Sequence, residues 1–179
     1  LEDDTLFKYV AKAISNNNVI GFFDGKAEFG PRALGSRSIL ADPRNSKAQQ
    51  LLNEKIKKRE SFRPFAPSIL EDYGEEYFKN YQFTPFMERV LPIRKEKQKL
   101  IPAVTHVDGS GRLQSVSKEL RPRYYELILE FYNITGIPIL INTSFNENEP
   151  VVNIPEEAID CYLRTDMDML VIGNYILEK

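Results

Sequence analysis

Residues 122–142 read PRYYELILEFYNITGIPILIN, in which a helical pattern runs directly into a strand pattern. Pro122 favours the first turn of a helix, where no hydrogen-bonded N–H is lost, and Gly136 favours its end. The predicted buried stripe of this helix consists of Tyr125, Ile128, Leu129 and Tyr132. The apolar run at 137–142 is short and bounded by turn formers, which predicts a strand buried on both faces.

The segments on either side repeat the alternation of helices and strands. Strands are predicted at 19–23, 65–70, 169–172 and 175–178. Further helices are predicted from Asp4 or Thr5, from about Ser46 and from Pro155, the last with Ala158, Ile159, Tyr162 and Leu163 facing inward. Alternating elements of both kinds indicate an α/β fold with a mixed sheet.

Three connecting segments carry separate predictions. Residues 24–45 form a loop that is long for a compact domain, which suggests a function rather than a mere connection. Residues 80–100 have no clear period and are predicted to be irregular. Residues 104–116 read VTHVDGSGRLQSV, and the Asp-Gly pair between apolar alternations predicts a β-hairpin.

The 179 residues include 24 Lys and Arg and 26 Asp and Glu, which gives a net charge of −2. One domain with one core is expected at this length. A near-neutral chain has no overall field that would attract nucleic acid or an acidic membrane. Any affinity for anions must therefore be local.

The single cysteine, Cys161, cannot form an internal disulfide, and we predict a buried structural thiol rather than a nucleophile. The sequence has neither a basic leader followed by an apolar run nor an apolar run of membrane-spanning length. These features predict a soluble, cytoplasmic protein with no membrane partner. The chain begins with Leu1 rather than Met, which suggests a fragment of a longer protein.

Residues 29–38, FGPRALGSRS, hold Arg32 and Arg37 in a segment punctuated by Gly30 and Gly35. Glycine permits close backbone approach, and a guanidinium offers five donors in a planar fork that suits phosphate or carboxylate. The pattern is typical of an anion site. Two solvated arginines on a surface loop are the alternative interpretation.

Residues 57–65, KKRESFRPF, place cations among phenylalanines and a proline. The cationic members are Lys57, Lys58, Arg59 and Arg63. Phe62 and Phe65 are predicted to pack inward and to hold the arginine between them near the surface. The helix dipole alone also favours cations at a helix C-terminus, although this does not account for the last arginine. We predict that 57–65 and 29–38 form two walls of one anion pocket.

Polar residues follow the buried strand directly, in INTSFN at 141–146. The side chains that could contact a ligand there are Asn142, Thr143, Ser144 and Asn146. Ligands of α/β proteins usually bind at the carboxyl ends of strands, although a polar turn can also satisfy only its own backbone. Arg112 follows an Asp-Gly-Ser-Gly turn, and His106 is interpreted as a packed, hydrogen-bonded residue. The sequence has no zinc-type spacing of Cys and His and no phosphate-binding P-loop motif.

Five blocks together resemble the C-terminal domain of the O-carbamoyltransferase family, which includes nodulation and antibiotic-tailoring carbamoyltransferases. They read EFGPRALGSRSILADPR, KKRESFRPFAPSI, HVDGSGRLQSV, PRYYELILEFYNITGIPILINTSFN and EPVV. The resemblance runs over nearly the whole chain. It implies that residues 1–179 form a YrdC-like α/β domain, a twisted mixed β-sheet flanked by helices. Lys57-x-Arg59 and Ser144-x-Asn146 match the KxR and SxN signature of YrdC-like domains.

The resemblance also implies an activity. The domain would bind carbamoyl phosphate and ATP with Mg²⁺ and form carbamoyl adenylate and pyrophosphate. A separate N-terminal domain, similar to Kae1 and holding iron or another metal, would pass the carbamoyl group to a substrate hydroxyl. No stretch of this sequence resembles that domain, so it is expected as a partner in a full-length protein.

By this resemblance the catalytic residues are Lys57, Arg63, Arg32 and Arg112. The cofactor-binding residues are Arg59, Asn142, Ser144, Asn146 and Arg37, and no metal is held by the protein itself. The arginines and the lysine are expected on phosphate or carbamoyl oxygens, and the asparagines and the serine on the nucleotide and magnesium side. The run SFNENEP is one residue shorter than in the family and lacks its usual glycine, so the loop carrying Asn146 must differ.

Two other functions are carried as alternatives. A nucleic-acid-binding module is disfavoured by the near-neutral charge and by the lack of a basic and aromatic stripe. A catalytically silent nucleotide-binding or docking domain would bind ATP without turnover that depends on carbamoyl phosphate.

Overall fold

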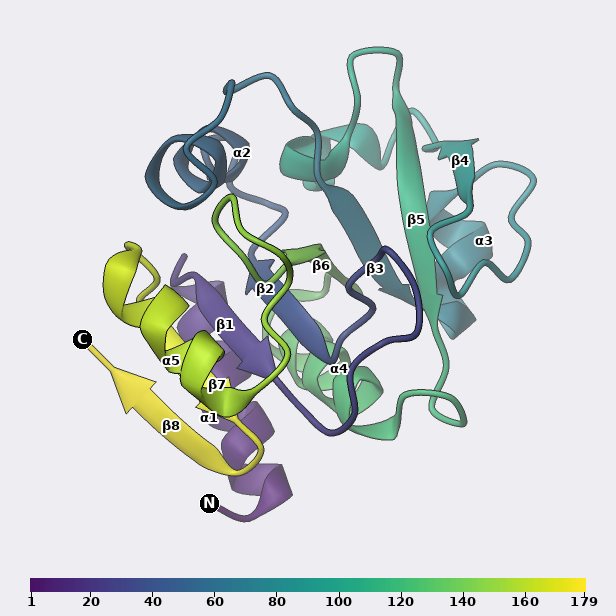
Figure 1. The fold of residues 1–179 in the computed structure, drawn as a ribbon. Helices are drawn as coiled ribbons and strands as arrows, with labels where there is room; N and C mark the ends of the chain where they lie inside the picture. Colours follow the sequence, from purple (N-terminus) through teal and green to yellow (C-terminus); the bar gives the residue numbers. More distant parts are fainter.

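Eight strands form one mixed sheet in the computed structural model, which describes residues 1–179 apart from the side chain of Lys55. Their order across the sheet is β4-β5-β3-β6-β2-β1-β7-β8 (Figure 1). The strands are β1 Ile20–Phe23, β2 Arg37–Ala41, β3 Ala66–Leu70, β4 Arg89–Pro92, β5 Ser110–Val116, β6 Ile139–Ser144, β7 Met169–Ile172 and β8 Tyr175–Glu178. The predicted fold class, a mixed sheet flanked by helices, is confirmed.

The helices connect these strands. They are α1 Asp3–Ser15, α2 Ala48–Leu51, α3 Gly74–Tyr77, α4 Pro122–Thr135 and α5 Pro155–Arg164. Helix α2 continues into a π-helical segment, Leu52–Ile56, and short 3₁₀ turns lie at Glu71–Tyr73, Gln98–Leu100 and Pro102–Val104. The predicted helix starts are close to the observed ones. Glu2 occupies the N-cap of α1, however, in place of the predicted Asp4 or Thr5.

The two faces of the sheet are covered by different helices. Side chains alternate between the faces along β1. Phe22 packs against Tyr124 of α4, with ring centroids 6.2 Å apart, whereas Gly21 faces the ring of Phe145 on the other side. Helix α1 lies beside α4 on the first face, and α5 lies over β1 and β7 on the second (Figure 1). A Cβ atom at Gly21 would lie 2.7 Å from Phe145 Cζ, so the strand needs glycine there.

Strand β6 lies in the middle of the sheet and pairs antiparallel with both neighbours, β2 and β3. Asn142 is aligned with Leu40 on one side and with Ala66 on the other. Residues 139–142 are buried, which confirms the prediction of a strand covered on both faces. The end of β6 therefore adjoins the start of β3, because antiparallel neighbours run in opposite directions.

Helix α4 begins with Pro122 at its first position and ends before Gly136, which has a φ of 72°, as predicted.

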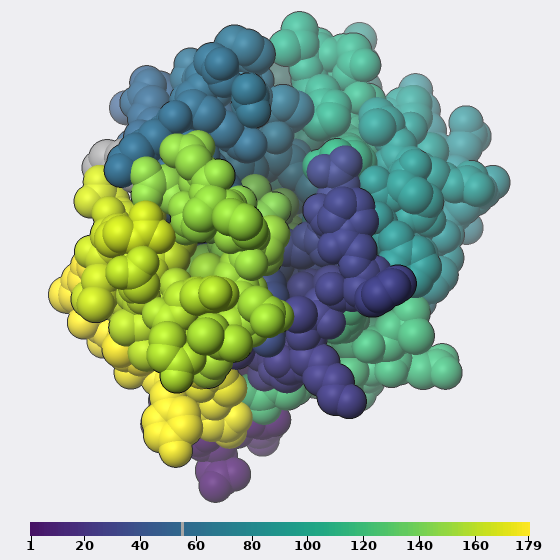
Figure 2. Space-filling model, in the orientation of Figure 1, coloured from purple at the N-terminus to yellow at the C-terminus, as the bar shows by residue number. Residues whose placement is uncertain are grey.

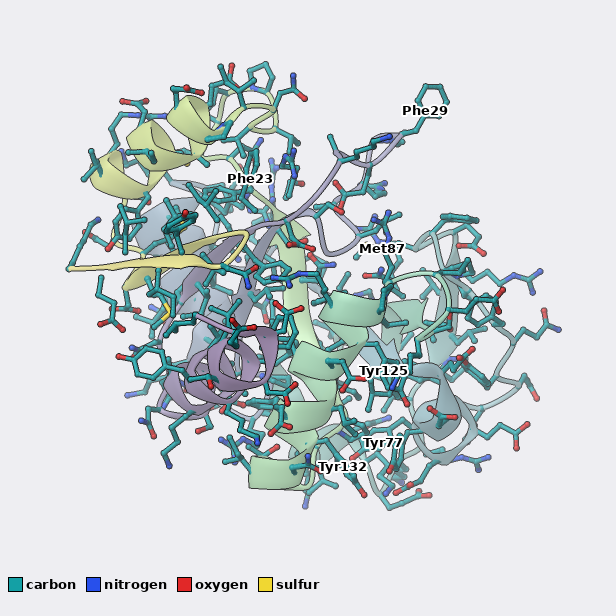
Figure 3. The ribbon with its side chains drawn as sticks, turned by 90° about the horizontal axis from the view of Figure 1, so that it is seen from below. Phe23, Phe29, Tyr77, Met87, Tyr125 and Tyr132 are labelled. Carbon is teal, nitrogen blue, oxygen red and sulfur yellow. The ribbon has the colours of Figure 1, made fainter. Side chains whose placement is uncertain are left out.

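The buried face of α4 is shifted by one residue from the predicted one, and only Ile128 belongs to both. The buried residues are Tyr124, Leu127, Ile128 and Phe131. Tyr125 instead donates its hydroxyl to Asp72 at 2.7 Å, at the margin of the packed face. Figure 3 shows Tyr125 and Tyr132 on the side of α4 that is nearer Tyr77. A tyrosine ring at such a margin keeps its polar end accessible.

Three predicted connections were wrong. Residues 104–116 contain one strand, β5, preceded by a turn, rather than a hairpin. The antiparallel partner of β5 is β4, which lies in the 80–100 segment predicted to be irregular. The predicted loop 24–45 contains β2, so the connecting segment is 24–36. A long connection separates β4 from β5, and β2 pairs with the distant β6 as well as with β1, so a local pattern does not reveal these strands.

Helix α5 contacts β1 and β7 largely through the predicted face. Ala158, Cys161 and Tyr162 are buried and Ile159 is partly buried against the core, whereas the prediction was wrong for Leu163, which is 66% exposed. The buried Cys161 agrees with the predicted structural thiol, and burial raises its pKa to about 12.

Candidate functional site

The segment 24–36 between β1 and β2 is folded around one carboxylate. Glu28 Oε1 accepts the main-chain N–H groups of Leu34 at 2.7 Å, Ser36 at 2.7 Å and Arg37 at 3.3 Å. Three donors on one oxygen close the base of the segment and fix the path of residues 29–34. Figure 2 shows this segment standing on the surface between the segment around residue 150 and the part of the chain beyond residue 80.

Two residues of the segment 24–36 stand out: Gly35, just before β2, and Phe29, at the outer tip. Gly35 has a φ of +102°, and a Cβ atom there would lie 2.3 Å from Tyr124 Cδ1, so only glycine fits without displacement. Phe29 lies at the outer tip, fully exposed, with its ring pointing away from the body of the protein (Figure 3).

Three buried polar side chains tie this segment to the centre of the sheet. Gln114 of β5 donates from Nε2 to Leu34 O at 2.9 Å. Its Oε1 accepts from Ser68 Oγ at 2.7 Å and from Asn142 Nδ2 at 2.9 Å. Asn142 Nδ2 also donates to Ala33 O at 3.1 Å. These bonds join the loop to β5, β3 and β6, and we refer to Ser68, Gln114 and Asn142 as the buried amide network.

A small pocket of about 110 Å³ lies between this loop and the end of β6. Its polar lining residues are Arg32, Arg59, Arg112, Asn142, Thr143 and Ser144. Five of these six were predicted as site residues, and the sixth was recognised as a possible ligand contact. Both predicted walls contribute, because the pocket contains Arg32 from the first segment and Arg59 from the second. We refer to this pocket as the arginine pocket.

Two arginines of the arginine pocket repel each other. Burial lowers the pKa of Arg112, and the neighbouring Arg32 lowers it further. Among the residues whose side chains are described, neither forms a salt bridge. An anion bound between them would replace this repulsion with attraction.

Arg59 is positioned by contacts with Asn53 and Phe65. Its Nε donates to Asn53 Oδ1 at 2.6 Å, and its guanidinium lies 5.0 Å from the centre of the Phe65 ring. Burial, and then repulsion from Arg63, lowers the pKa of Arg59. A guanidinium held by one edge retains other N–H groups for a ligand.

Lys57 lies beneath the pocket rather than in its wall. It is 3% exposed, and its Nζ donates to Ser144 O at 2.6 Å, Asn146 O at 2.7 Å and Asn146 Oδ1 at 2.7 Å. Burial, and then repulsion from Arg59, lowers its pKa to about 7. The KxR and SxN residues are thus in direct contact, and the lysine fastens the loop that follows β6.

Arg63 and Phe62 lie outside the arginine pocket. Arg63 pairs with Glu60 at 2.8 Å, and its side chain is 53% exposed. Phe62 was predicted to pack inward, but it is 76% exposed, whereas Phe65 is buried as predicted. One buried aromatic anchor suffices for this turn, because Asn53 Nδ2 also binds Arg63 O at 2.9 Å.

Arg37 is buried and committed to the main chain. Its guanidinium lies 3.5 Å from the centre of the Phe23 ring and donates to Asp24 O, Gly25 O, Ser36 O and Asn153 O. It does not line the arginine pocket. The predicted role of Arg37 in binding a nucleotide therefore has no geometric support in this arrangement.

The shortened loop after β6 is pinned by ion pairs. Arg164 of α5 pairs with Glu147 and Glu149 at 3.0 Å each, and Asn146 Nδ2 donates to Glu149 O at 2.6 Å. Both ends of the Asn146 amide are therefore hydrogen-bonded within the protein, because Oδ1 accepts from Lys57 and Nδ2 donates to Glu149 O.

Sequence reasoning missed Glu28 and Gln114. A glutamine within the apolar alternation 113–116 is a signal of a buried hydrogen-bonded group, since an unpaired amide would be costly there. No comparable signal marks Glu28, because its partners become visible only when the loop is folded.

A second, larger pocket adjoins the first and shares Pro64 with it. It has a volume of about 450 Å³, and its walls include Phe62, Val104, His106 and Val107. Phe62 and Val107 are strongly exposed, so this apolar pocket opens to solvent. His106 accepts or donates a hydrogen bond with Ser110 Oγ at 3.2 Å, as expected for a packed histidine.

Neither a metal cluster nor a membrane span is found in the described part of the chain. Among these residues no group of three or more His, Cys, Asp and Glu side chains could hold a metal ion. The described helices are each too short or too polar to cross a bilayer.

The fold is similar to that of several solved proteins. P. abyssi Sua5 complexed with L-threonine matches with a TM-score of 0.70 and 13% identity, covering 95% of this chain and 47% of the other. Full-length HypF in its phosphate- and nucleotide-bound form matches with a TM-score of 0.69 and 20% identity, covering 94% and 25%. These similarities show that the chain has the α/β fold of the matched Sua5 and HypF structures, a mixed sheet flanked by helices.

Comparison of the sequence identifies the family to which the chain belongs. Residues 11–179 match the family described as carbamoyltransferase C-terminus, and the chain belongs to that family. Nodulation protein NolNO of Sinorhizobium fredii is 48% identical over 180 residues, which cover 98% of this chain and 26% of the relative. The chain spans about a third or less of the curated relatives it matches, with 32%, 26% and 33% for three of them.

Proposed function

We propose that this chain is the carbamoyl-activating domain of an ATP-dependent O-carbamoyltransferase. Water cleaves bound carbamoyl phosphate to carbamate and inorganic phosphate. A carbamate oxygen then attacks the α-phosphorus of ATP, the bond to the β-phosphate oxygen breaks, and carbamoyl adenylate and pyrophosphate form. The protein's part is to position the two anions and to stabilise their charge, as phosphoryl and nucleotidyl transfer generally require.

The observation that carries this proposal is the unpaired approach of Arg32 and Arg112. Two guanidinium groups that repel each other in a small pocket favour a bound anion, and Arg59 adds a third fork of donors. The pocket of about 110 Å³ is far smaller than the roughly 300 Å³ at which pockets begin to hold drug-sized ligands. It therefore suits the carbamoyl phosphate end rather than a whole nucleotide.

The neighbouring apolar pocket supports binding of the nucleotide. It shares Pro64 with the arginine pocket and presents the exposed ring of Phe62, so a base could stack there while its phosphates extend toward Arg59. The described residues offer no cluster of carboxylates for Mg²⁺. Magnesium would therefore arrive on the phosphates of ATP, which it usually binds while keeping several waters.

Transfer to the acceptor hydroxyl belongs to another domain in this proposal. The curated relatives are about three to four times the length of this chain, which leaves room for a Kae1-like domain. The acceptor would be selected by that domain.

The proposal is tested by calorimetric titration of carbamoyl phosphate and of ATP with Mg²⁺ into this chain, its Arg112→Ala and Arg59→Ala variants and, as a control, Arg94→Ala. Arg94 lies outside both pockets and donates to Glu75 O. We expect binding of both ligands and at least a tenfold loss, about 1.4 kcal/mol, in the two pocket variants only. Binding of ATP alone would favour a catalytically silent nucleotide-binding domain. Equal losses in all three variants would refute the assignment of the pocket.

A further inference from the structure

The side-chain amide of Asn142 has only one orientation that its surroundings allow. Gln114 donates from Nε2 to Leu34 O, which turns its Oε1 toward Asn142. Ala33 O is a second acceptor on the same side of Asn142. Two acceptors require the NH₂ group of Asn142 to face the buried amide network, because a flipped amide would bring oxygen against oxygen.

The opposite end of this amide is an acceptor without a donor. Asn142 is 1% exposed, and its Oδ1 has no hydrogen-bond partner among the described residues. The residue lines the arginine pocket. A buried acceptor normally finds a donor, so this oxygen requires an explanation.

The rest of the pocket is rich in donors. Arg32, Arg59 and Arg112 offer only N–H groups to a ligand. A fully ionised phosphate ester group offers only acceptors and would satisfy the arginines but not Asn142 Oδ1. A ligand that satisfies both must carry an anion at one end and an N–H or O–H donor at the other, and the NH₂ of a carbamoyl group is such a donor.

We propose that Asn142 Oδ1 accepts a hydrogen bond from the NH₂ of the carbamoyl group and thereby selects carbamoyl phosphate over acyl phosphates that lack an N–H. This inference rests on the proposed function and reassigns Asn142 from the nucleotide side, where the sequence suggested it, to the carbamoyl end. The small pocket restricts the partner to a group of this size, which argues against the amino group of a nucleobase.

The preference arises from the cost of leaving the acceptor unpaired. Acetyl phosphate has a methyl group in place of the NH₂ and otherwise the same shape and charge. It would place a methyl group beside Asn142 Oδ1 and leave this buried acceptor without a donor. Sites built to hydrogen-bond a substrate group reject the analogue that lacks the group by large factors.

The first test requires no substitution. Binding of carbamoyl phosphate, acetyl phosphate and inorganic phosphate to the unmodified chain is compared by calorimetry under identical conditions. We expect carbamoyl phosphate to bind at least ten times more tightly than acetyl phosphate. Equal affinity of the two would overturn this inference and leave the proposed function standing, whereas no binding of carbamoyl phosphate would remove the proposed function itself.

Two variants distinguish recognition of the carbamoyl NH₂ by Asn142 from support of the segment 24–36 by the buried amide network. Asn142→Leu removes both ends of the amide, and Gln114→Leu removes only the network behind it. We expect Asn142→Leu to bind the two acyl phosphates about equally and Gln114→Leu to keep the preference at lower overall affinity. A preference that survives in a folded Asn142→Leu chain, judged by circular dichroism, would overturn the assignment.

Discussion

The ammonium group of Lys57 donates to the main-chain oxygen of Ser144 at 2.6 Å, although 87 positions separate the two residues. Its other two N–H groups reach Asn146 O and Asn146 Oδ1. All three protons of the ammonium are therefore used within the protein. Lys57 holds the end of β6 in position for the arginine pocket, which is a different contribution from that of an exposed cation.

Replacing Lys57 by Met should lower the free energy of unfolding by about 2 to 3 kcal/mol, because buried oxygens lose charged donors. Phosphate affinity should fall as well, since Ser144 lines the pocket. Lys58→Met is the matched control: Lys58 is 57% exposed and pairs with Glu147, a bond worth less than about 1 kcal/mol. Urea unfolding of both variants checks the prediction, and equal losses would contradict the role of Lys57.

The stability difference between the unmodified chain and Lys57→Met should depend on pH. Burial and Arg59 lower the pKa of Lys57 from 10.5 to about 7 in the folded state. Between these values the unfolded chain binds more protons, so folding becomes more favourable as pH rises. Unfolding at pH 6.5 and pH 9 should show the unmodified chain gaining stability relative to the variant. A difference that stays constant would show that the pKa is not lowered.

The Arg112→Ala and Arg37→Ala variants should differ in their free energy of unfolding. Arg112→Ala removes a cation repelled by Arg32, so the unfolding free energy should stay the same or rise by up to about 1 kcal/mol. Arg37→Ala removes a guanidinium that donates to four main-chain oxygens and should destabilise by about 2 to 4 kcal/mol. Thermal unfolding measured together with phosphate binding separates the two cases. Loss of stability in Arg112→Ala would contradict this contrast.

Gly35→Ala should be much more damaging than Gly25→Ala. Both glycines have positive φ, but a Cβ atom at Gly35 would meet the Tyr124 ring, whereas none of the described atoms lies within 4 Å at Gly25. Strain alone costs about 1 kcal/mol or more, and the clash adds to it at Gly35. Melting temperatures and phosphate binding of the two variants test this prediction. Similar melting temperatures would mean that the ring moves aside easily.

The sequence predicted those parts of the fold that local signals determine. Pro122 and Gly136 mark the ends of α4, and the apolar run before Asn142 marks β6. The partner of β5 could not be predicted in the same way. The Asp-Gly turn near Ser110 is real, but the strand after it pairs with residues 89–92 and with β3 rather than with the residues before the turn.

The membership of the candidate site was predicted better than the geometry of its members. Arg32, Arg59 and Arg112 were selected from three separate segments, and they line one pocket. Whether a cation faces a ligand or the main chain depends on contacts distant in sequence. Lys57 and Arg37 therefore looked like ligand contacts in the sequence, although both are directed to main-chain oxygens.

Glu28 has a consequence for how charge is recognised at this surface. Many phosphate-binding loops cradle the anion with their own backbone amides. Here two amides of the segment 24–36 and the amide of Arg37, the first residue of β2, are already occupied by the carboxylate of Glu28, an internal substitute for an external anion. Selectivity for the ligand must then reside in individual side chains. Substitution can change these one at a time while the backbone of the loop stays the same.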